Sequence, residues 1–411
     1  MNLLQLAHRL PWPPIDGGKK GTLGFVDGYR RHPEVSRHAL LCMCPQEEAT
    51  WAAEWKPQGT ELHVDLMDAR NSIPRVLANT VFSRKPFNMA KYERRSFEQR
   101  LHEALVRIRP DVVHFDSLHT TSYASLVRAQ APQALRVLRC HNAEHVILQR
   151  LADSETQPMK KALIGLQARR LHAYEAAALD AFDLILAITE ADAARFRAMN
   201  PRVDARMIVV PAGADLPDEL PPAPAEGGLI RLLHVAAMDW LPNQAGLRWL
   251  IIEVLPLLDA AGLNYHLDIV GKNMPEEFRS YTGARVTVHG FVQDLAPITS
   301  RAHVALVPLQ VGGGMRVKIL DYWAMGVPVV ATPVGAEGLA DGAEPAVSVA
   351  ASPAGFAGAI LNLAQSSDER ACLRASAFRK VSESYGWPGI VDGLVARYRA
   401  LLAARPEVAV E

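Results

Sequence analysis

The chain has 411 residues, of which 49% are hydrophobic, and its 44 Lys and Arg residues balance 44 Asp and Glu residues. This length suits two domains of roughly 200 residues each better than a single core. The zero net charge, together with the lack of a zinc-finger spacing or an aromatic RNA-binding pattern, argues against a nucleic-acid partner.

Strands alternate with helical segments through the first half of the chain, which is typical of a parallel sheet covered by helices on both faces. Cys42 and Cys44, in the run ALLCMCP, fall on one face of a strand and indicate packing rather than metal binding. His114 is expected to be buried in its strand. Strands are predicted at residues 2–7, 38–43, 61–66, 111–115, 135–140, 183–188 and 207–211.

The sequence also carries information about the cellular compartment. Its four cysteines are few and scattered, which favours a reduced, cytoplasmic protein. The apolar run at the amino terminus is too short for a signal peptide. No segment approaches the ~20 apolar residues needed to cross a bilayer, so we expect no membrane-spanning helix.

The first half of the chain is the more basic one. Residues 1–215 contain 29 Lys and Arg against 24 Asp and Glu. Within it, segment 83–101 alternates basic and apolar side chains, a pattern that can rest on anionic lipid headgroups. The alternative is a solvated helix face held by local pairs such as Glu98 with Arg94. The basic residues of the segment are Arg84, Lys85, Lys91, Arg94, Arg95 and Arg100, and the apolar ones are Phe87, Met89, Tyr92 and Phe97.

A domain linker is predicted at residues 213–229, where the sequence is rich in Pro, Ala and Gly and has no hydrophobic period. Residues 1–212 then form the first domain and residues 230–385 the second. The second domain restarts with the apolar strand LIRLLHVAA and ends its sheet near AVSVA. Residues 386–411 contain an amphipathic helix.

The segment GGGMRVKILDYWAMGVPVVATPVGAEGL, residues 312–339, predicts an anion site. Three glycines leave backbone N–H groups open to a ligand, and a helix starting near Met315 adds the positive end of its dipole. Arg316 and Lys318 fall in the predicted first turn, where an anion would compensate them. VPVVAT, residues 327–332, predicts a buried parallel strand. The alternative is a glycine-rich turn before an ordinary helix.

This segment resembles the donor-binding region of retaining glycosyltransferases of family 4, in which a glycine-rich loop opens a helix of the form KILEAMAxGxPVV. The likeness extends over most of the chain. The other segments that resemble family signatures are HRLPWPPIDGGKKGT, DVVHFD, CHNAEH, DLILAITEADAARF, VVPAGADL, LLHVAAMDWLPNQAGLRWL and LDIVGKN.

The resemblance implies an α/β protein of the GT-B fold, with two Rossmann-like, doubly wound domains that face a central cleft. The first domain would take the acceptor and the second the nucleotide-sugar donor. The last helix of the family crosses back to the first domain, and Trp387 and Tyr398 are expected to anchor it by core packing.

The resemblance also assigns donor-binding residues. Asp321 falls where the family binds ribose hydroxyls, but the family's second glutamate is replaced by Gly313. The family's Arg and Lys after the first strand of the second domain are replaced by MDWLPN, which either shifts the diphosphate contacts to Arg316, Lys318 and Lys272 or alters which donor is accepted. Asp239 either contacts the donor sugar or caps the next helix. The predicted donor-binding set is Gly17, Gly18, Asp239, Lys272, Gly313, Gly314, Met315 and Asp321, with Gly17 and Gly18 in a loop.

The predicted catalytic residues are Asp116, His141, Arg316 and Lys318. Asp116 either orients the acceptor, receives its proton, or ends a strand as a turn residue. His141 and Glu144 contact the donor sugar or its neighbouring loop, or serve as structural residues. With no DxD motif and no His or Cys cluster, we expect no cofactor and no essential metal.

The reaction implied by the resemblance is retaining transfer of a sugar from a nucleoside diphosphate to a saccharide or lipid-linked acceptor. By family analogy, it would take place at the inner face of the cytoplasmic membrane and serve cell-surface polysaccharide or glycolipid assembly. The alternatives are a sugar-nucleotide epimerase and a non-catalytic nucleotide-sugar-binding partner of a glycan assembly machine.

Overall fold

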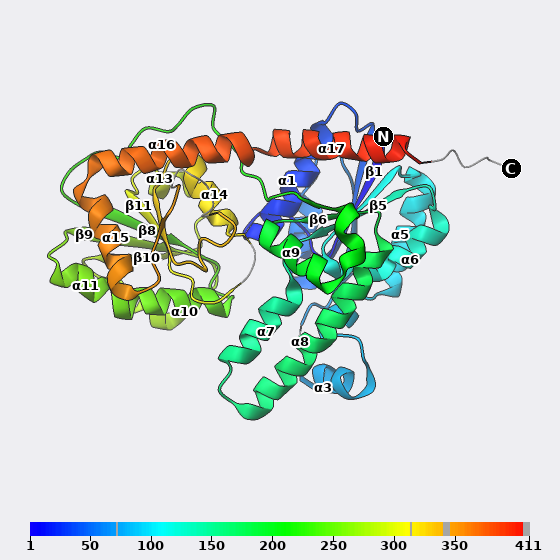
Figure 1. Cartoon of the computed structure of the whole chain (residues 1–411), viewed down its shortest axis with the longest axis horizontal. Coiled ribbons are helices and arrows are strands. Elements are labelled where there is room, and N and C mark those ends of the chain that lie inside the picture. Colours follow the sequence, from blue (N-terminus) through cyan, green and yellow to red (C-terminus); the bar gives the residue numbers. More distant parts are fainter. Residues whose placement is uncertain (71–72, 313–314, 340–345, 406–411) are drawn as a thin grey trace. The chain divides into compact units, whose positions relative to one another are not determined.

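The computed structural model describes residues 1–70, 73–312, 315–339 and 346–405 (Figure 1). Gly313 and Gly314, of the predicted donor loop, lie outside the described residues. The chain divides into two compact units. Unit 1 comprises Met1–Pro211 with Trp387–Glu411, and unit 2 comprises Ala212–Gly386.

Unit 1 is built on a seven-stranded parallel sheet with the order β3-β2-β1-β4-β5-β6-β7. Near-continuous apolar runs form its central strands because both faces of the sheet are covered. All the strands predicted for this half are present, with ends that differ by at most two residues. They are β1 (Asn2–Ala7), β2 (Arg37–Pro45), β3 (Glu61–Met67), β4 (Val112–Asp116), β5 (Leu135–Cys140), β6 (Leu184–Ala187) and β7 (Met207–Val209).

The main helices of unit 1 cover this sheet, and α7 and α8 form an antiparallel pair that projects away from it (Figure 1). Cys42, Cys44 and His114 are buried, as predicted. The helices are α1 (Gly17–Arg31), α2 (Ala49–Glu54), α3 (Ile73–Phe82), α4 (Phe87–Ala90), α5 (Arg95–Ile108), α6 (Ala124–Gln130), α7 (Glu144–Ser154), α8 (Pro158–Ala178), α9 (Glu190–Met199) and α17 (Trp387–Ala403).

Helix α1 corrects one prediction. Asp16 is its N-cap and accepts a hydrogen bond from the backbone N–H of Lys19. Gly17 and Gly18 are therefore the first residues of the helix and do not form a loop.

Helix α17 packs along α1 inside unit 1. Trp387 and Val391 lie directly against Gly24 and Gly28, where any larger side chain on α1 would collide with them. Tyr398 is fully buried, and its hydroxyl lies 2.9 Å from that of Tyr29. This segment, which follows β7 only after the whole of unit 2, thus completes the core of the first unit.

Unit 2 has a six-stranded parallel sheet with the order β10-β9-β8-β11-β12-β13. Its strands are β8 (Ile230–Val235), β9 (Tyr265–Val270), β10 (Val286–Gly290), β11 (Val304–Val307), β12 (Val329–Ala331) and β13 (Ser348–Val349). Its helices are α10 (Leu241–Trp249), η5 (Leu250–Val254), α11 (Leu255–Ala260), α12 (Glu276–Arg279), α13 (Ala296–Thr299), α14 (Val317–Ala324), α15 (Pro353–Gln365) and α16 (Ser367–Ser384).

Helix α14 begins later than predicted. Arg316 is its N-cap, with φ −88° and ψ 85°, so Lys318 lies in the first turn but Arg316 lies outside it. The predicted strand 327–332 is also shorter, because only Val329–Ala331 pairs with neighbouring strands. Among the described residues, no helix is long and apolar enough to cross a membrane.

Candidate functional site

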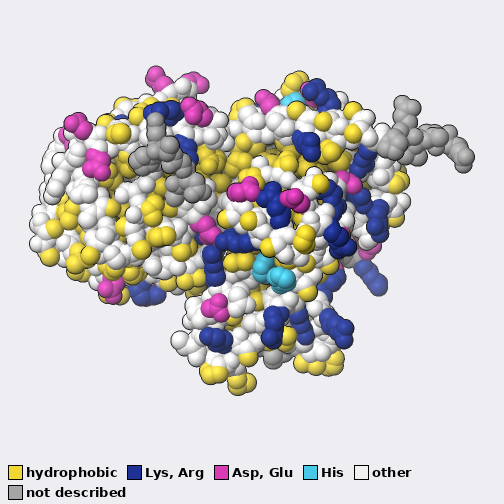
Figure 2. Space-filling model, in the orientation of Figure 1, with side chains coloured by type: hydrophobic (Ala, Val, Ile, Leu, Met, Phe, Trp, Pro, Cys, Tyr) yellow, Lys and Arg dark blue, Asp and Glu magenta, His cyan; other side chains and the backbone are white. Residues whose placement is uncertain are grey.

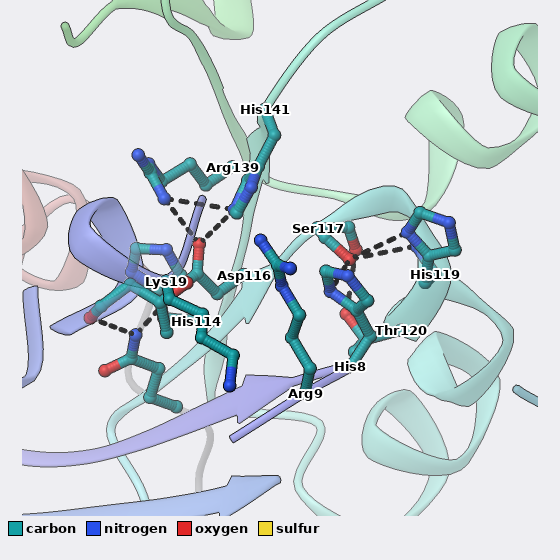
Figure 3. Close-up of polar contacts among 12 residues, drawn as sticks. His8, Arg9, Lys19, His114, Asp116, Ser117, His119, Thr120, Arg139 and His141 are labelled. Carbon is teal, nitrogen blue, oxygen red and sulfur yellow. Dashed lines mark hydrogen bonds and ion pairs between the residues drawn. The ribbon is translucent and has the colours of Figure 1, made fainter. Parts of the chain in front are cut away.

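Each sheet has a point where the strand order reverses, and the loops there diverge to leave room for a ligand. In unit 1 this point lies between β1 and β4, which pair in parallel. His8 and Arg9 follow β1, Ser117 follows β4, and His141 follows β5 (Figure 3). The polar residues of unit 1 are therefore concentrated at the position where a doubly wound sheet binds ligands.

Asp116 ends β4 and is fully buried. Its carboxylate accepts hydrogen bonds from Gln5 Nε2 at 2.9 Å, Arg139 at 2.8 Å and His141 Nε2 at 2.8 Å (Figure 3). Burial alone would raise the pKa of Asp116, but Arg139 and His141 outweigh it and hold the pKa well below its usual value. A carboxylate this acidic is a poor proton acceptor, which opposes that predicted role and favours the orienting one.

The bond to Asp116 favours one tautomer of His141. An ionised carboxylate can only accept, so the 2.8 Å contact requires a proton on His141 Nε2 and leaves the lone pair on Nδ1. Arg139 also lies 3.0 Å from Nε2, but it can only donate and already has Asp116 as its acceptor. Burial, reinforced by Arg139, lowers the pKa of His141, while Asp116 acts in the opposite direction. At neutral pH, His141 is therefore a neutral imidazole with one basic nitrogen.

Sequence reasoning missed Arg139, which lies at the centre of this network. Its side chain is only 2% exposed and stacks 4.8 Å from the ring centre of Phe25. Gly21 leaves space for it, because an added Cβ there would lie 2.7 Å from the Arg139 guanidinium. The signal in the sequence is a charged residue inside the apolar strand LRVLRC, where charge is tolerated only with a partner.

Ser117, His8 and His119 form a second polar group, also missed from the sequence. Ser117 Oγ lies 2.9 Å from His8 Nδ1 and 3.2 Å from His119 Nδ1, and the two rings stack at 4.5 Å (Figure 3). Ser117 has φ 149°, a strained region for any residue but glycine. Burial, followed by the effect of His119 and Arg9, lowers the pKa of His8, and burial lowers the pKa of His119 to about 3.

The two groups are neighbours. The rings of His8 and His141 are 6.2 Å apart, edge to face. Arg9 forms two hydrogen bonds with Asp16, at 3.0 and 2.6 Å, and its guanidinium lies against Gly18. Neutral imidazoles and a paired cation together suit a hydroxyl-rich ligand.

Glu144 opens α7 beside this site. Burial, reinforced by the carboxylate of Glu175, raises the pKa of Glu144 to about 7. Glu175 itself accepts from the backbone N–H of Glu144 at 3.1 Å and lies 2.6 Å from His145 Nδ1. Glu144 is thus a carboxyl group that exchanges a proton near neutral pH.

In unit 2 the strand order reverses between β8 and β11, and α14 begins at the same edge. The guanidinium carbon of Arg316 lies 5.7 Å from the centre of the Trp240 ring. Gly312 has φ 152°, and a Cβ there would lie 2.7 Å from Arg316. Burial, followed by the charge of Arg316, lowers the pKa of Lys318 to about 7, with Asp321 acting in the opposite direction. The predicted cations are therefore brought together at a helix N-terminus.

Two other predicted donor residues of unit 2, Asp239 and Lys272, follow β8 and β9. Lys272 Nζ is 3.1 Å from Asp239 Oδ2. Asp239 does not cap α10, because the N-cap is Trp240 and it makes no side-chain capping bond. Met315 is half-buried and packs against the core of unit 2. No group of three described His, Cys, Asp or Glu side chains is placed to hold a metal ion.

Two family models match the chain. The model for Glycosyltransferase Family 4 matches residues 49–217, and the model for Glycosyl transferases group 1 matches residues 230–366. Together they cover well over half of the sequence and include Asp116, His141, Arg316 and Lys318. The protein is a family 4 glycosyltransferase. A search of curated proteins finds no match.

Solved structures share the fold of this glycosyltransferase. Sucrose-phosphate synthase from Thermosynechococcus elongatus is 17% identical with a TM-score of 0.71, covering 98% of this chain and 100% of that one. HepE from Anabaena, in complex with UDP, is 12% identical with a TM-score of 0.66 over 97% of this chain and 100% of HepE. The lipopolysaccharide outer core galactosyltransferase WaaB is 12% identical with a TM-score of 0.60, covering 97% of this chain and 99% of WaaB. The two α/β units therefore have the GT-B fold.

Proposed function

We propose that this glycosyltransferase transfers a sugar from a nucleoside-diphosphate sugar to a hydroxyl of a saccharide or lipid-linked acceptor, with retention of anomeric configuration. The observation that carries the proposal is the placement of Arg316 and Lys318 together at the start of α14, where burial, followed by the charge of Arg316, lowers the pKa of Lys318 to about 7. A bound diphosphate would relieve this repulsion. The complexes of HepE with UDP and with UDP-glucose support a nucleotide-sugar donor.

The donor half of the reaction consists mainly in stabilising the leaving group. Negative charge grows on the departing diphosphate, and we assign Arg316, Lys318 and the dipole of α14, which lie together at the start of this helix, to offset it. Asp321, one helical turn after Lys318, is the proposed ligand of the ribose hydroxyls. Because side-chain cations supply the positive charge, the proposed reaction needs no metal ion.

The acceptor half is assigned to unit 1. His141 presents an unprotonated Nδ1, and Asp116 holds the imidazole ring by a hydrogen bond to Nε2. We assign His141 to the acceptor hydroxyl, which would donate a hydrogen bond to Nδ1. Ser117, His8 and His119 offer further hydrogen bonds to a sugar. Asp116 is a positioning residue, because its carboxylate is buried behind His141.

Calorimetry with a panel of nucleoside diphosphates and their sugars tests the donor assignment. The wild type is expected to bind one nucleotide tightly, and Arg316→Ala with Lys318→Ala to weaken it strongly. Arg248→Ala with Arg285→Ala is the matched control, because both are half-exposed surface cations of the same unit. If no nucleotide bound, or if the control weakened binding equally, the assignment would be overturned.

The replacement of the family's second glutamate by Gly313 favours one competing candidate, a non-catalytic nucleotide-sugar-binding protein. Incubation with the bound nucleotide sugar and a panel of lipid-linked and free saccharides separates the candidates. Transfer to an acceptor, with release of the nucleoside diphosphate, supports the proposal. Binding without turnover supports the non-catalytic candidate, and conversion of the donor alone supports an epimerase.

A further inference from the structure

Unit 1 carries a helical extension formed by α3 and the α7–α8 pair, and its surface differs from the rest of the molecule. The three most exposed large hydrophobic side chains among the described residues all belong to it: Met159 is 89% exposed, Phe82 88% and Val81 72%. Large apolar side chains that stand this far out of a surface mark a site of interaction.

The charge of the extension is equally one-sided. Residues 73–82 and 150–170, which cover α3 and the outer part of the α7–α8 pair, contain six Lys and Arg against two Asp and Glu. The whole chain, by contrast, is neutral. Figure 2 shows Lys and Arg side chains interspersed with hydrophobic ones over α7, α8 and α3. Exposed apolar side chains surrounded by positive charge are complementary to an anionic lipid surface.

The two parts of the extension are tied together. Gln167 Nε2 of α8 donates to Thr80 Oγ1 of α3 at 3.0 Å, and Arg170 donates to the carbonyl of Thr80 at 2.9 Å. The backbone N–H of Phe87 donates to Gln167 Oε1 at 3.2 Å. These bonds hold the end of α3, with Val81 and Phe82, against α8.

The basic segment at residues 83–101 is a weaker lipid-binding candidate. Met89 and Phe97 are buried, so these apolar residues are not available to a membrane. Arg94 pairs with Asp65 at 2.8 Å, and Lys85 forms an ion pair with Glu93. This segment behaves as a structural element of unit 1, and the exposed apolar side chains lie beside it in the chain.

We propose that the exposed surface of the helical extension, which carries Val81, Phe82, Met159 and the neighbouring Lys and Arg side chains, docks the protein on a bilayer that contains anionic phospholipid. This inference rests on the proposed function, since a surface-bound enzyme meets a lipid-linked acceptor at the membrane. The apolar side chains enter the headgroup boundary, and the basic side chains contact lipid phosphates.

Flotation with vesicles tests the proposal. The wild type is expected to bind vesicles of phosphatidylcholine with phosphatidylglycerol, to bind phosphatidylcholine alone weakly, and to detach as salt rises from about 0.1 to about 0.5 M. Val81→Ser with Phe82→Ser and Met159→Ser is expected to reduce binding by about tenfold or more. Phe291→Ser is the matched control, because Phe291 is a 59% exposed phenylalanine of unit 2.

Charge reversal supplies an independent variant. Lys161→Glu with Arg169→Glu, two exposed cations of α8, should reduce vesicle binding and its salt dependence, whereas Arg248→Glu should leave both unchanged. Equal binding to neutral and anionic vesicles, or wild-type binding by the apolar variant, would overturn the proposal and leave a protein partner as the occupant of the surface.

Nucleotide calorimetry on the same variants separates this inference from the proposed function. An unchanged nucleotide affinity shows that the variants are folded, so a loss of vesicle binding then supports the docking surface. If the protein binds no nucleotide but its vesicle binding still depends on these residues, the docking surface is supported and the proposed transferase function is rejected.

Discussion

The two candidate sites differ in how their charged side chains are arranged. In unit 1, Asp116 is paired with Arg139 and His141, and Arg9 is paired with Asp16. In unit 2, Arg316 and Lys318 lie close enough for one to lower the pKa of the other. A site whose charges are already paired is preorganised for a neutral ligand such as a hydroxyl. A site where cations crowd each other is stabilised by an incoming anion.

The largest expected effect tests the crowded site. Replacing Arg316 and Lys318 together by Ala should lower kcat by about 10³-fold or more, because fixed cations that face a leaving group contribute most of this catalysis. Steady-state transfer assays would measure the loss. An equally large loss of kcat in Arg248→Ala with Arg285→Ala would show that the effect is not specific to Arg316 and Lys318.

Asp116→Asn tests the paired site. The amide leaves Arg139 buried beside a neutral partner and should cost about 3–5 kcal/mol in the free energy of unfolding. Urea denaturation would measure this loss. Asp259→Asn is the control, because it removes the carboxylate from a half-exposed pair with Arg285 and should cost at most about 1 kcal/mol.

The pH dependence of Asp116 follows from its depressed pKa. The unfolded chain binds a proton at pH ~3.9, so the stabilisation is fully present above that pH and is lost as the pH falls through the lower folded-state pKa. The difference in the free energy of unfolding between the wild type and Asp116→Asn, measured by urea denaturation, should therefore become smaller from neutral to acid pH. A constant difference would contradict the buried ion pair.

Lys318 gives a smaller effect that is specific to unit 2. With a pKa of about 7 in the free protein, it is mostly charged at pH 6 and mostly neutral at pH 8. Nucleoside-diphosphate affinity should therefore fall by up to about tenfold over this range. Lys318→Arg should flatten the dependence in calorimetry, since arginine stays charged. The same slope in that variant would assign the titration to another group.

The smallest effect tests the strain at Ser117. Both Ser117→Ala and Ser117→Gly lose the hydrogen bonds to His8 and His119, but only glycine relieves the backbone at φ 149°. The glycine variant should therefore be more stable than the alanine variant by about 1 kcal/mol. Thermal denaturation of the pair would measure the difference, and equal stability would show that this backbone is unstrained.

Local sequence was sufficient for the strands, because each one is an apolar run bounded by turn residues. It also placed Asp116 and His141 at the ends of β4 and β5, since each stands at the end of such a run. The prediction of a loop at Gly17 and Gly18 was wrong, because the N-cap formed by Asp16 starts a helix there despite the loop preference of glycine. The predicted start of α14 was wrong as well, because the helix begins only after Arg316.

The sequence by itself determined two α/β units, the family, and which cations stand at the start of α14. These depend on apolar periodicity and on residues that are close in the chain. Only the tertiary structure decided that Arg139 neutralises Asp116, that Ser117 joins His8 to His119, and that α17 completes the core of unit 1. Apart from the Ser117–His119 bond, these contacts join residues far apart in the chain, and no local pattern specifies them. The polar contacts form because parallel strands bring their carboxyl ends to one edge, and α17 joins unit 1 because its apolar side chains pack on α1.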